Sequence, residues 1–420
     1  MPDLTKEESH RWPQFLSDGR RFIFMGWSSR STSGNDRFTI QVASLDAPQP
    51  AVLTGAASAA VYDPAGYLLF AHNVPPRLVA VPFDGTRIGG SAVTVAEDFI
   101  YDWVSGQLPV TSTPDRTLAY LNDRHDYVQP TWFDRAGNAL GALADRGVYF
   151  DPAMSPDGAT VVLEKSDPDI RSGDLWAIDA ATGADTRLTH DPTFDNVAVW
   201  SPDGREIGFS SDRDGLSHVY LMRADGAGQA RKVFGPPGVM AYATDWSRDG
   251  AHLLVTTLNA QRNGDVWLVP TGPQGQPRAL LESRYEEQDA VFSPDGRWIA
   301  YASNESGDFH VYVRSWPGLA DVTRISVRDG RQPQWRADGR ELYFATRDGT
   351  IMAVPIAPGS GPLRAGSPER LFTTRLNLLQ GMRNSYAPSP DGRRFLVLSP
   401  VVDRRSSPVT TVLNWTELMR

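Results

Sequence analysis

The sequence contains no cysteine among its 420 residues. Disulfide bonds and metal sites built from thiolates are therefore excluded. This absence fits a protein of a reducing compartment, although a chain without cysteine is also compatible with a periplasm.

Long apolar runs are absent as well. No stretch approaches the roughly 20 apolar residues of a membrane-spanning helix, and residues 1–8 have no apolar core of a signal peptide. As given, the chain is predicted to be soluble and cytoplasmic and to have no membrane span. If a leader or an upstream domain has been removed, a periplasmic location becomes possible.

Positive charge is scarce relative to negative charge. Lysine and arginine number 41 against 50 aspartate and glutamate residues, which gives a formal net charge of −9. This balance argues against a general nucleic-acid binder, because phosphate contacts require a basic face. A long helical period is also missing, whereas the 37 glycines and 32 prolines suit a chain with many turns.

One short motif recurs along the chain, and it predicts the fold. Residues 199–209 read VWSPDGREIGF. Pro202 fixes φ for a turn, and the following Asp203-Gly204 supplies a side-chain acceptor and a permissive backbone. Ile207 and Phe209 then alternate with polar or small neighbours, as in a half-buried strand. The motif therefore predicts a β-hairpin.

Nine copies of this hairpin align on the turn glycine or its equivalent, with a period of about 45 residues. The nine anchors are Gly19, Gly66, Arg116, Gly158, Gly204, Gly250, Gly296, Gly339 and Gly392. In the third copy arginine replaces glycine, so we expect a different turn there. Four short antiparallel strands in each repeat at this period are typical of propeller blades.

We therefore predict an all-β fold, a single closed β-propeller domain over residues 1–420 with four-stranded antiparallel blades. The nine predicted units lie near residues 6–54, 55–98, 99–146, 147–191, 192–235, 236–282, 283–328, 329–376 and 377–420. The copies at residues 66 and 116 are the weakest, and a strict count gives seven; eight blades are the alternative to nine. Only three strands are visible in the last unit, so an N-terminal strand at residues 3–6 is expected to complete it and close the ring.

A repeated order of an aromatic residue, Ser-Pro-Asp-Gly, an apolar strand, Ser-x-x-x-Gly and another apolar strand resembles the TolB-type propeller repeat, which is PD40-type and WD40-like. Residues 210–215, followed by Val219-Tyr220, match it closely. More narrowly, residues 10–16 and 411–415 resemble the propeller region that follows the kinase domain in some bacterial serine/threonine kinases. This resemblance implies a sensor or protein-interaction module.

The sequence carries no catalytic motif of the two enzyme groups with similar blades. It contains neither the Gly-rich loop nor the other signatures of a kinase, and no Gly-x-Ser-x-Gly elbow of the propeller-capped serine peptidases. Its seven histidines show no metal-ligand spacing, and Arg213 separates the carboxylates of Asp212 and Asp214. We therefore predict no catalytic residue, no metal and no cofactor.

Polar residues that precede the anchors are the best candidates for binding, because equivalent positions of different blades converge at one opening of a propeller. Mixed charges and amides suit a polar peptide or a carbohydrate. The predicted rim residues are Asp195, Asn196, Gln288, Asp289, Arg331, Gln332, Arg383 and Asn384. A stripe of aromatic residues before the turns is instead predicted to pack neighbouring blades together: Trp200, Trp246, Phe292 and Trp335.

The function that the sequence favours is a non-enzymatic scaffold, a monomer that binds a protein or peptide partner at one face of the ring. The alternative is an enzyme, either a metal-assisted carbohydrate lyase, as some TolB-like propellers are, or a hydrolase with its site at the channel mouth. A cluster of histidine and carboxylate side chains at one rim would favour the enzyme.

Overall fold

The computed structural model describes residues 9–27, 38–72, 77–97, 99, 106–121, 127–167, 172–259, 264–273, 275–374, 376, 384–401 and 409–419. These residues form antiparallel sheets and one short 3-10 helix, η1 (Trp415–Met419). Within the described ranges, no helix is long and apolar enough to cross a membrane.

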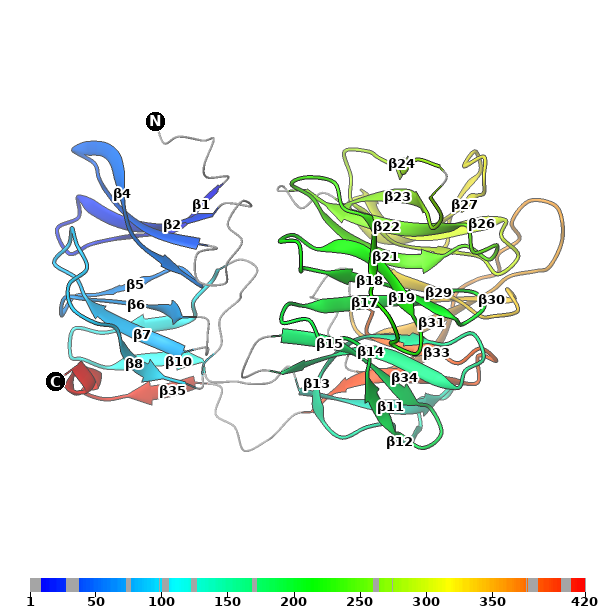
Figure 1. Ribbon diagram of the computed structural model, residues 1–420, viewed down its shortest axis with the longest axis horizontal. Coiled ribbons are helices and arrows are strands. Elements are labelled where there is room, and N and C mark those ends of the chain that lie inside the picture. The colour runs from blue at the N-terminus through cyan, green and yellow to red at the C-terminus, as the bar shows by residue number, and fades with distance from the viewer. Residues whose placement is uncertain are drawn as a thin grey trace. The chain divides into compact units, whose positions relative to one another are not determined.

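The described residues divide into two compact units, whereas the sequence predicted one domain (Figure 1). The first unit takes its residues from 1–125 and 402–420, and the second from 126–167 and 172–401. The all-β class and the antiparallel four-stranded repeats that the sequence predicted are confirmed.

The first unit contains three sheets. The first sheet has the order β1 (Ser9–Phe15), β2 (Arg21–Trp27), β3 (Phe38–Ser44) and β4 (Ala47–Ala56). The second has the order β5 (Val61–Asp63), β6 (Tyr67–His72), β7 (Arg77–Pro82) and β8 (Val93–Ala96). The third joins β9 (Val110–Ser112) and β10 (Leu118–Leu121) to β35 (Val409–Val412) from the far end of the chain.

Four sheets of the second unit each use four consecutive strands. They are β17 (Asp195–Trp200), β18 (Glu206–Ser211), β19 (His218–Arg223) and β20 (Arg231–Phe234); β21 (Met240–Trp246), β22 (His252–Leu258), β23 (Gly264–Pro270) and β24 (Arg278–Leu281); β25 (Glu287–Phe292), β26 (Trp298–Ser306), β27 (Asp308–Ser315) and β28 (Val322–Arg324); and β29 (Arg331–Trp335), β30 (Glu341–Ala345), β31 (Thr350–Pro355) and β32 (Glu369–Thr373).

The remaining strands of the second unit form one eight-stranded sheet made of two four-stranded groups. One group is β13 (Gly147–Met154), β14 (Thr160–Asp167), β15 (Ser172–Asp179) and β16 (Asp185–Arg187). The other is β33 (Tyr386–Pro388), β34 (Arg394–Pro400), β11 (Tyr127–Asp134) and β12 (Ala139–Ala142). Strand β11 pairs with β34 from Val128 to Asp134 and joins the groups through a short pairing with β13.

This pairing corrects the predicted boundaries of two repeat units. Of the strands expected in the unit 99–146, β9 and β10 belong to the third sheet of the first unit, whereas β11 and β12 belong to the sheet of β34. Strand β35 was expected in the unit 377–420 but pairs with β10. The predicted closing strand at residues 3–6 lies outside the described residues. Strands β11 and β12 complete the last group instead, because Trp132 of β11 buries its side chain in one cluster with Leu396 of β34.

All nine anchors lie in tight turns with positive φ, so the hairpin repeat is confirmed. Ser201 shows why the motif favours this turn: its hydroxyl donates to Asp203 Oδ1 at 2.7 Å and accepts the backbone N–H of Glu206 at 2.9 Å. The exposed Arg116 was expected to need a different turn, but its φ of 67° matches the 70° of Gly204. The turn geometry is therefore kept despite the arginine side chain.

Replacing Arg116 with glycine is expected to stabilise the first unit by roughly 1 kcal/mol, because left-handed backbone costs about 1–2 kcal/mol for a residue with a Cβ and the greater freedom of unfolded glycine offsets part of the gain. The midpoint of urea denaturation of the first unit measures the effect. A lowered midpoint would contradict the assigned strain.

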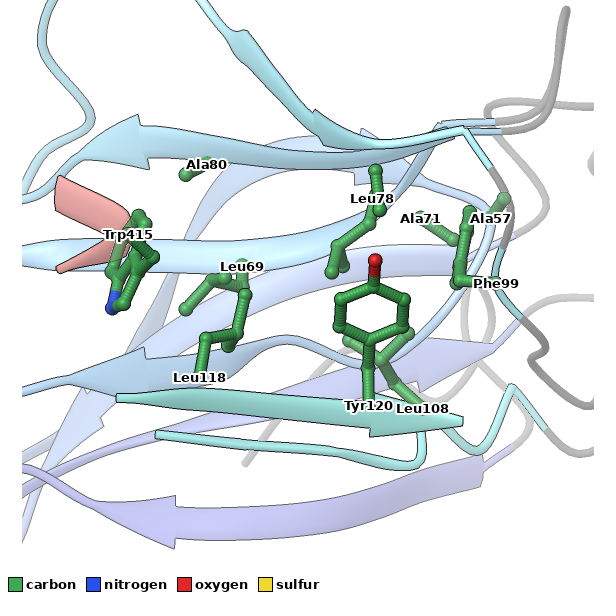
Figure 2. Packing of buried hydrophobic residues seen from close by; sticks show 11 residues of the cluster. Ala57, Leu69, Ala71, Leu78, Ala80, Phe99, Leu108, Leu118, Tyr120 and Trp415 are labelled. Atoms are coloured by element: carbon green, nitrogen blue, oxygen red, sulfur yellow. The ribbon is translucent and has the colours of Figure 1, made fainter. Parts of the chain in front are cut away.

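Apolar clusters join neighbouring sheets in both units. In the first unit, Leu69, Leu78, Leu118 and the fully buried Trp415 belong to one cluster, and Figure 2 shows the Trp415 side chain among these residues. In the second unit, the aromatic stripe does the predicted packing: Trp200 also donates its indole N–H to the carbonyl of Ala153 in the neighbouring group at 3.1 Å. The other three stripe residues belong to clusters with the preceding sheet: Trp246, Phe292 and Trp335.

Candidate functional site

The first strand of each four-stranded group in the second unit is called an inner strand here; the six are β13, β17, β21, β25, β29 and β33. Consecutive inner strands contact each other from β13 to β29, and β33 contacts β13. The backbone N–H of Ser385 donates to Gln332 Oε1 at 3.0 Å and links β29 to the start of β33. The N–H of Asn384 donates to Asp151 Oδ1 at 2.8 Å and links that start to β13.

Five of the six inner strands contain a register shift against their neighbour. In four of them the residue seven positions before the turn glycine has positive φ: Asp151, Val197, Asp289 and Gln332. A bulge of this kind changes the direction of the side chains that follow it. Simple alternation along these strands therefore does not tell which side chains share a face.

A cavity of about 10 Å³, measured as the space open to the centre of a water-sized sphere, lies among the inner strands. Its lining residues are Asp151, Val197, Ala198, Val199, Ala243, Thr244, Asp289, Val291, Gln334 and Asn384. This volume corresponds to about one water molecule. A peptide or sugar chain therefore does not fit inside it.

Asp289 lines this cavity and also connects two inner strands. Its carboxylate accepts the backbone N–H of Gln332 at 3.2 Å, and its residue is 7% exposed. Burial raises the pKa of Asp289 to about 6, while the hydrogen bond from Gln332 and the charge of Arg331 act in the opposite direction. Asp289 is therefore a buried structural carboxyl rather than a solvated rim residue.

The substitution Asp289→Asn is expected to remove a pH-dependent loss of stability. Because the folded pKa lies above the ordinary value of 3.8, the parent protein loses stability as pH rises from about 4 to about 6. The difference between the folded and the ordinary pKa corresponds to about 3 kcal/mol of unfolding free energy. Asparagine has no such titration and keeps an acceptor for the N–H of Gln332. Urea denaturation of both proteins between pH 4 and pH 8 tests this. Parallel pH profiles of the two proteins would contradict the buried-carboxyl assignment.

Asp195 is fully buried, and its charge is already paired. The guanidinium of Arg213 donates to Asp195 Oδ1 at 2.9 Å and Oδ2 at 3.1 Å. The same guanidinium lies 4.8 Å from the ring centre of Tyr220 and 5.4 Å from that of Phe209. Asp195 therefore belongs to an internal ion pair.

Asn196 and Gln288 occupy equivalent positions of β17 and β25, eight residues before the turn glycine. They are 6% and 4% exposed. Within the described part of the chain, Asn196 Oδ1 and Gln288 Nε2 have no hydrogen-bond partner. Asn384, at the same position before Gly392, lines the cavity. Two amides at this level thus keep unused hydrogen-bonding capacity.

The remaining predicted rim residues have different roles. Arg331 stacks on the ring of Phe309, with its guanidinium carbon 3.7 Å from the ring centre, and burial lowers the pKa of Arg331. The carbonyl of Gln332 accepts the hydroxyl of Tyr386 at 2.9 Å, so this residue ties two groups together. Arg383 lies outside the described residues.

Three carboxyl groups of the inner strands were not predicted as candidates: Asp151, Asp245 and Glu287. Asp151 lies seven residues before Gly158, as Asp289 lies seven before Gly296, and this shared offset would have identified it. Asp245 accepts the backbone N–H of Phe292 from the next sheet at 2.6 Å, and burial raises the pKa of Asp245 to about 7. Among the described residues, no three His, Cys, Asp or Glu side chains come together in a way that could hold a metal ion.

Comparison with known proteins places this architecture among TolB-like folds. Residues 134–260 match the PD40 family, described as TolB beta propeller domain. Among solved structures, the putative TolB from Agrobacterium tumefaciens covers 66% of this chain and 99% of its own, with 21% identity and a TM-score of 0.54. The predicted resemblance to the TolB-type repeat is confirmed, whereas the closer likeness to kinase-associated propellers stays a prediction.

Two curated relatives share part of this chain. The Uncharacterized peptidase YuxL of Bacillus subtilis is 27% identical over 193 residues, which are 37% of this chain and 29% of that protein. The Tol-Pal system protein TolB of Anaeromyxobacter dehalogenans is 34% identical over 106 residues, which are 24% of this chain and 23% of that protein. The chain thus spans less than a third of the length of each of these two relatives.

Proposed function

We propose that this chain is a non-enzymatic scaffold that binds a protein or peptide partner at the level of Asn196 and Gln288. In this proposal the six groups of the second unit are the blades of a closed six-bladed propeller, and the three sheets of the first unit are three further blades. The cyclic order of contacts among the inner strands supports the ring. The TolB-like fold supports a protein-binding role at a general level.

The observation that carries the proposal is the unused capacity of the two buried amides. Asn196 Oδ1 accepts a hydrogen bond, and Gln288 Nε2 donates one. A peptide backbone offers both complementary groups, and each such bond contributes about 1 kcal/mol. Because the cavity holds about one water molecule, we place the partner at the mouth, where the inner strands begin.

A capture experiment with matched variants tests the proposal. The intact chain, the double variant Asn196→Ala with Gln288→Ala, and the control Asn138→Ala are immobilised and exposed to lysate of the source cells. Asn138 is an exposed amide in the turn between β11 and β12. A specific protein should be retained by the parent and the control, and the affinity of the purified partner should fall about tenfold or more in the double variant.

Circular dichroism confirms that the double variant is folded. If the parent retains no protein specifically, or if all three chains retain the same protein equally, this scaffold model is wrong.

A hydrolase remains the second candidate, because the chain is similar to a protein named as a peptidase. Turnover of peptide and polysaccharide substrates by the intact chain, with and without added divalent metal, tests this alternative together with the predicted lyase. The monomeric state and the cellular location stay predictions from the sequence.

A further inference from the structure

Two repeats of the second unit can be compared position by position. When Gly204 is aligned with Gly296, Asp195 corresponds to Glu287 and Arg213 to Glu305. The local backbone agrees: the N–H of Arg213 donates to Ser211 Oγ at 3.4 Å, and that of Glu305 donates to Ser303 Oγ at 3.2 Å. Side chains at equal positions therefore occupy equivalent places in the two sheets.

In the sheet of β17–β20 these positions form a complete site for a guanidinium. One guanidinium nitrogen of Arg213, Nη2, donates to both carboxylate oxygens of Asp195, and the guanidinium lies over the neighbouring rings of Phe209 and Tyr220. The two rings lie 5.9 Å apart between centres, inclined at 33°. A buried carboxylate with two aromatic faces is an arrangement that favours arginine.

The sheet of β25–β28 keeps the walls of this site, but its cation comes from another position: the guanidinium carbon of Arg314 lies 5.8 Å from the ring centre of Tyr301. Tyr301 and Tyr312 replace the two rings, stacked at 5.7 Å between centres and inclined at 25°. Glu287 replaces the carboxylate and is 4% exposed. Its Oε1 accepts the hydroxyl of Ser283 at 2.6 Å, whereas Oε2 has no hydrogen-bond partner among the described residues. Glu305 stands where the arginine would be.

The charges around Glu287 leave it short of positive neighbours. Burial raises the pKa of Glu287, and the charges of Asp265 and Glu305 raise it further. The charge of Arg314 lowers the pKa of Glu287, but the hydrogen bonds of this guanidinium go to other groups: it donates to Tyr301 Oη at 2.9 Å and to the carbonyl of Leu319 at 3.3 Å. Among the described residues, Arg314 forms no ion pair with Glu287.

We propose that the slot between Glu287, Glu305 and the ring pair Tyr301–Tyr312 binds an arginine side chain supplied by the protein partner. This inference rests on the proposed scaffold function and specifies the chemistry of the partner. A guanidinium satisfies the unpartnered Oε2, compensates the carboxylates and stacks on the rings, as Arg213 does within its own sheet. Gln288 follows Glu287 directly, so the slot adjoins the predicted mouth.

Calorimetric titration with two small peptides tests the slot. The probe is acetyl-Gly-Arg-Gly-amide, and its control contains citrulline, which has nearly the same shape without the charge. The intact chain should bind the arginine peptide at least tenfold more tightly than the citrulline peptide at low ionic strength.

The substitution Glu305→Arg rebuilds the internal pair of the related sheet and should reduce the affinity for the arginine peptide at least tenfold, with no loss of thermal stability. Glu287→Gln should reduce it at least fivefold. The control Glu369→Arg, which changes the charge equally at an exposed position of β32, should leave the affinity within twofold of the parent.

Equal affinity for the two peptides, or unchanged affinity after Glu305→Arg, would overturn the assignment. Displacement of the arginine peptide by calcium chloride at constant ionic strength would indicate a metal site and would overturn it too. A partner that is lost by the Asn196/Gln288 variant but retained by Glu305→Arg would leave the scaffold function standing and remove only the arginine slot.

Discussion

Replacing Trp415 with alanine is expected to destabilise the first unit by about 3–5 kcal/mol and to leave the second unit folded. Trp415 is fully buried, and its ring meets that of Tyr67 edge to face with 5.3 Å between centres. Its cluster includes Leu69 of the second sheet and Leu118 of the third. Removing the indole leaves a large cavity between these sheets, so their packing is lost first.

Hydrogen exchange followed by mass spectrometry measures the two units separately in one experiment. Amides of β5–β10 should exchange much faster in Trp415→Ala, whereas those of β17–β32 should keep their protection. The control is Leu413→Ala, two residues earlier and 71% exposed, which should change stability by less than about 0.5 kcal/mol. If amide exchange is accelerated equally in both units of Trp415→Ala, the two units unfold together and the prediction is wrong.

The substitution Arg213→Ala is expected to cost the second unit about 3–5 kcal/mol, because it leaves the buried carboxylate of Asp195 without its partner. The side chain of Asp195 is 0% exposed and that of Arg213 is 23% exposed. The contacts of the guanidinium with Phe209 and Tyr220 disappear as well. Urea denaturation of the second unit measures the loss.

A double variant separates the buried charge from the lost packing. If the cost comes mainly from the unpaired carboxylate, adding Asp195→Asn to Arg213→Ala should restore part of the stability. Arg205→Ala, which removes an arginine side chain that is 86% exposed and 3.9 Å from Asp203, is the matched control and should change stability by less than about 1 kcal/mol. If Asp195→Asn destabilises the Arg213→Ala variant as much as it destabilises the parent, the explanation by an unpaired charge is refuted.

The hairpins could be predicted because each is specified within a few residues. Serine, aspartate and glycine satisfy the turn locally, so the anchors are visible without any knowledge of distant contacts. The order of strands at the ends of the repeat array was not visible in this way. Any four-stranded group can be completed by another copy of the same pattern, and only long-range packing, such as that of Trp132 on Leu396, selects β11 as the partner of β34.

The candidate site was predicted only in part, for a related reason. Position relative to the anchor correctly placed six of the predicted residues on inner strands, but it did not show which of them are already engaged in internal contacts. The partner of Asp195 is Arg213, which lies just after the next strand, β18. The acceptor for the backbone N–H of Gln332 is Asp289 in the preceding sheet. The bulges add to this difficulty, because they break the alternation from which side-chain direction is predicted.

The pairing of β10 with β35 also sets the order of events during protein synthesis. Strand β10 ends at Leu121, and β35 begins only at Val409, after about 290 further residues. At ordinary rates of translation this interval takes roughly 15–60 s. During this time the third sheet of the first unit lacks β35, and the edge of β10 that pairs with β35 is open. The second unit is synthesised completely in the same interval, because its strand β34 ends at Pro400. The unit whose synthesis starts first is therefore the last to be finished.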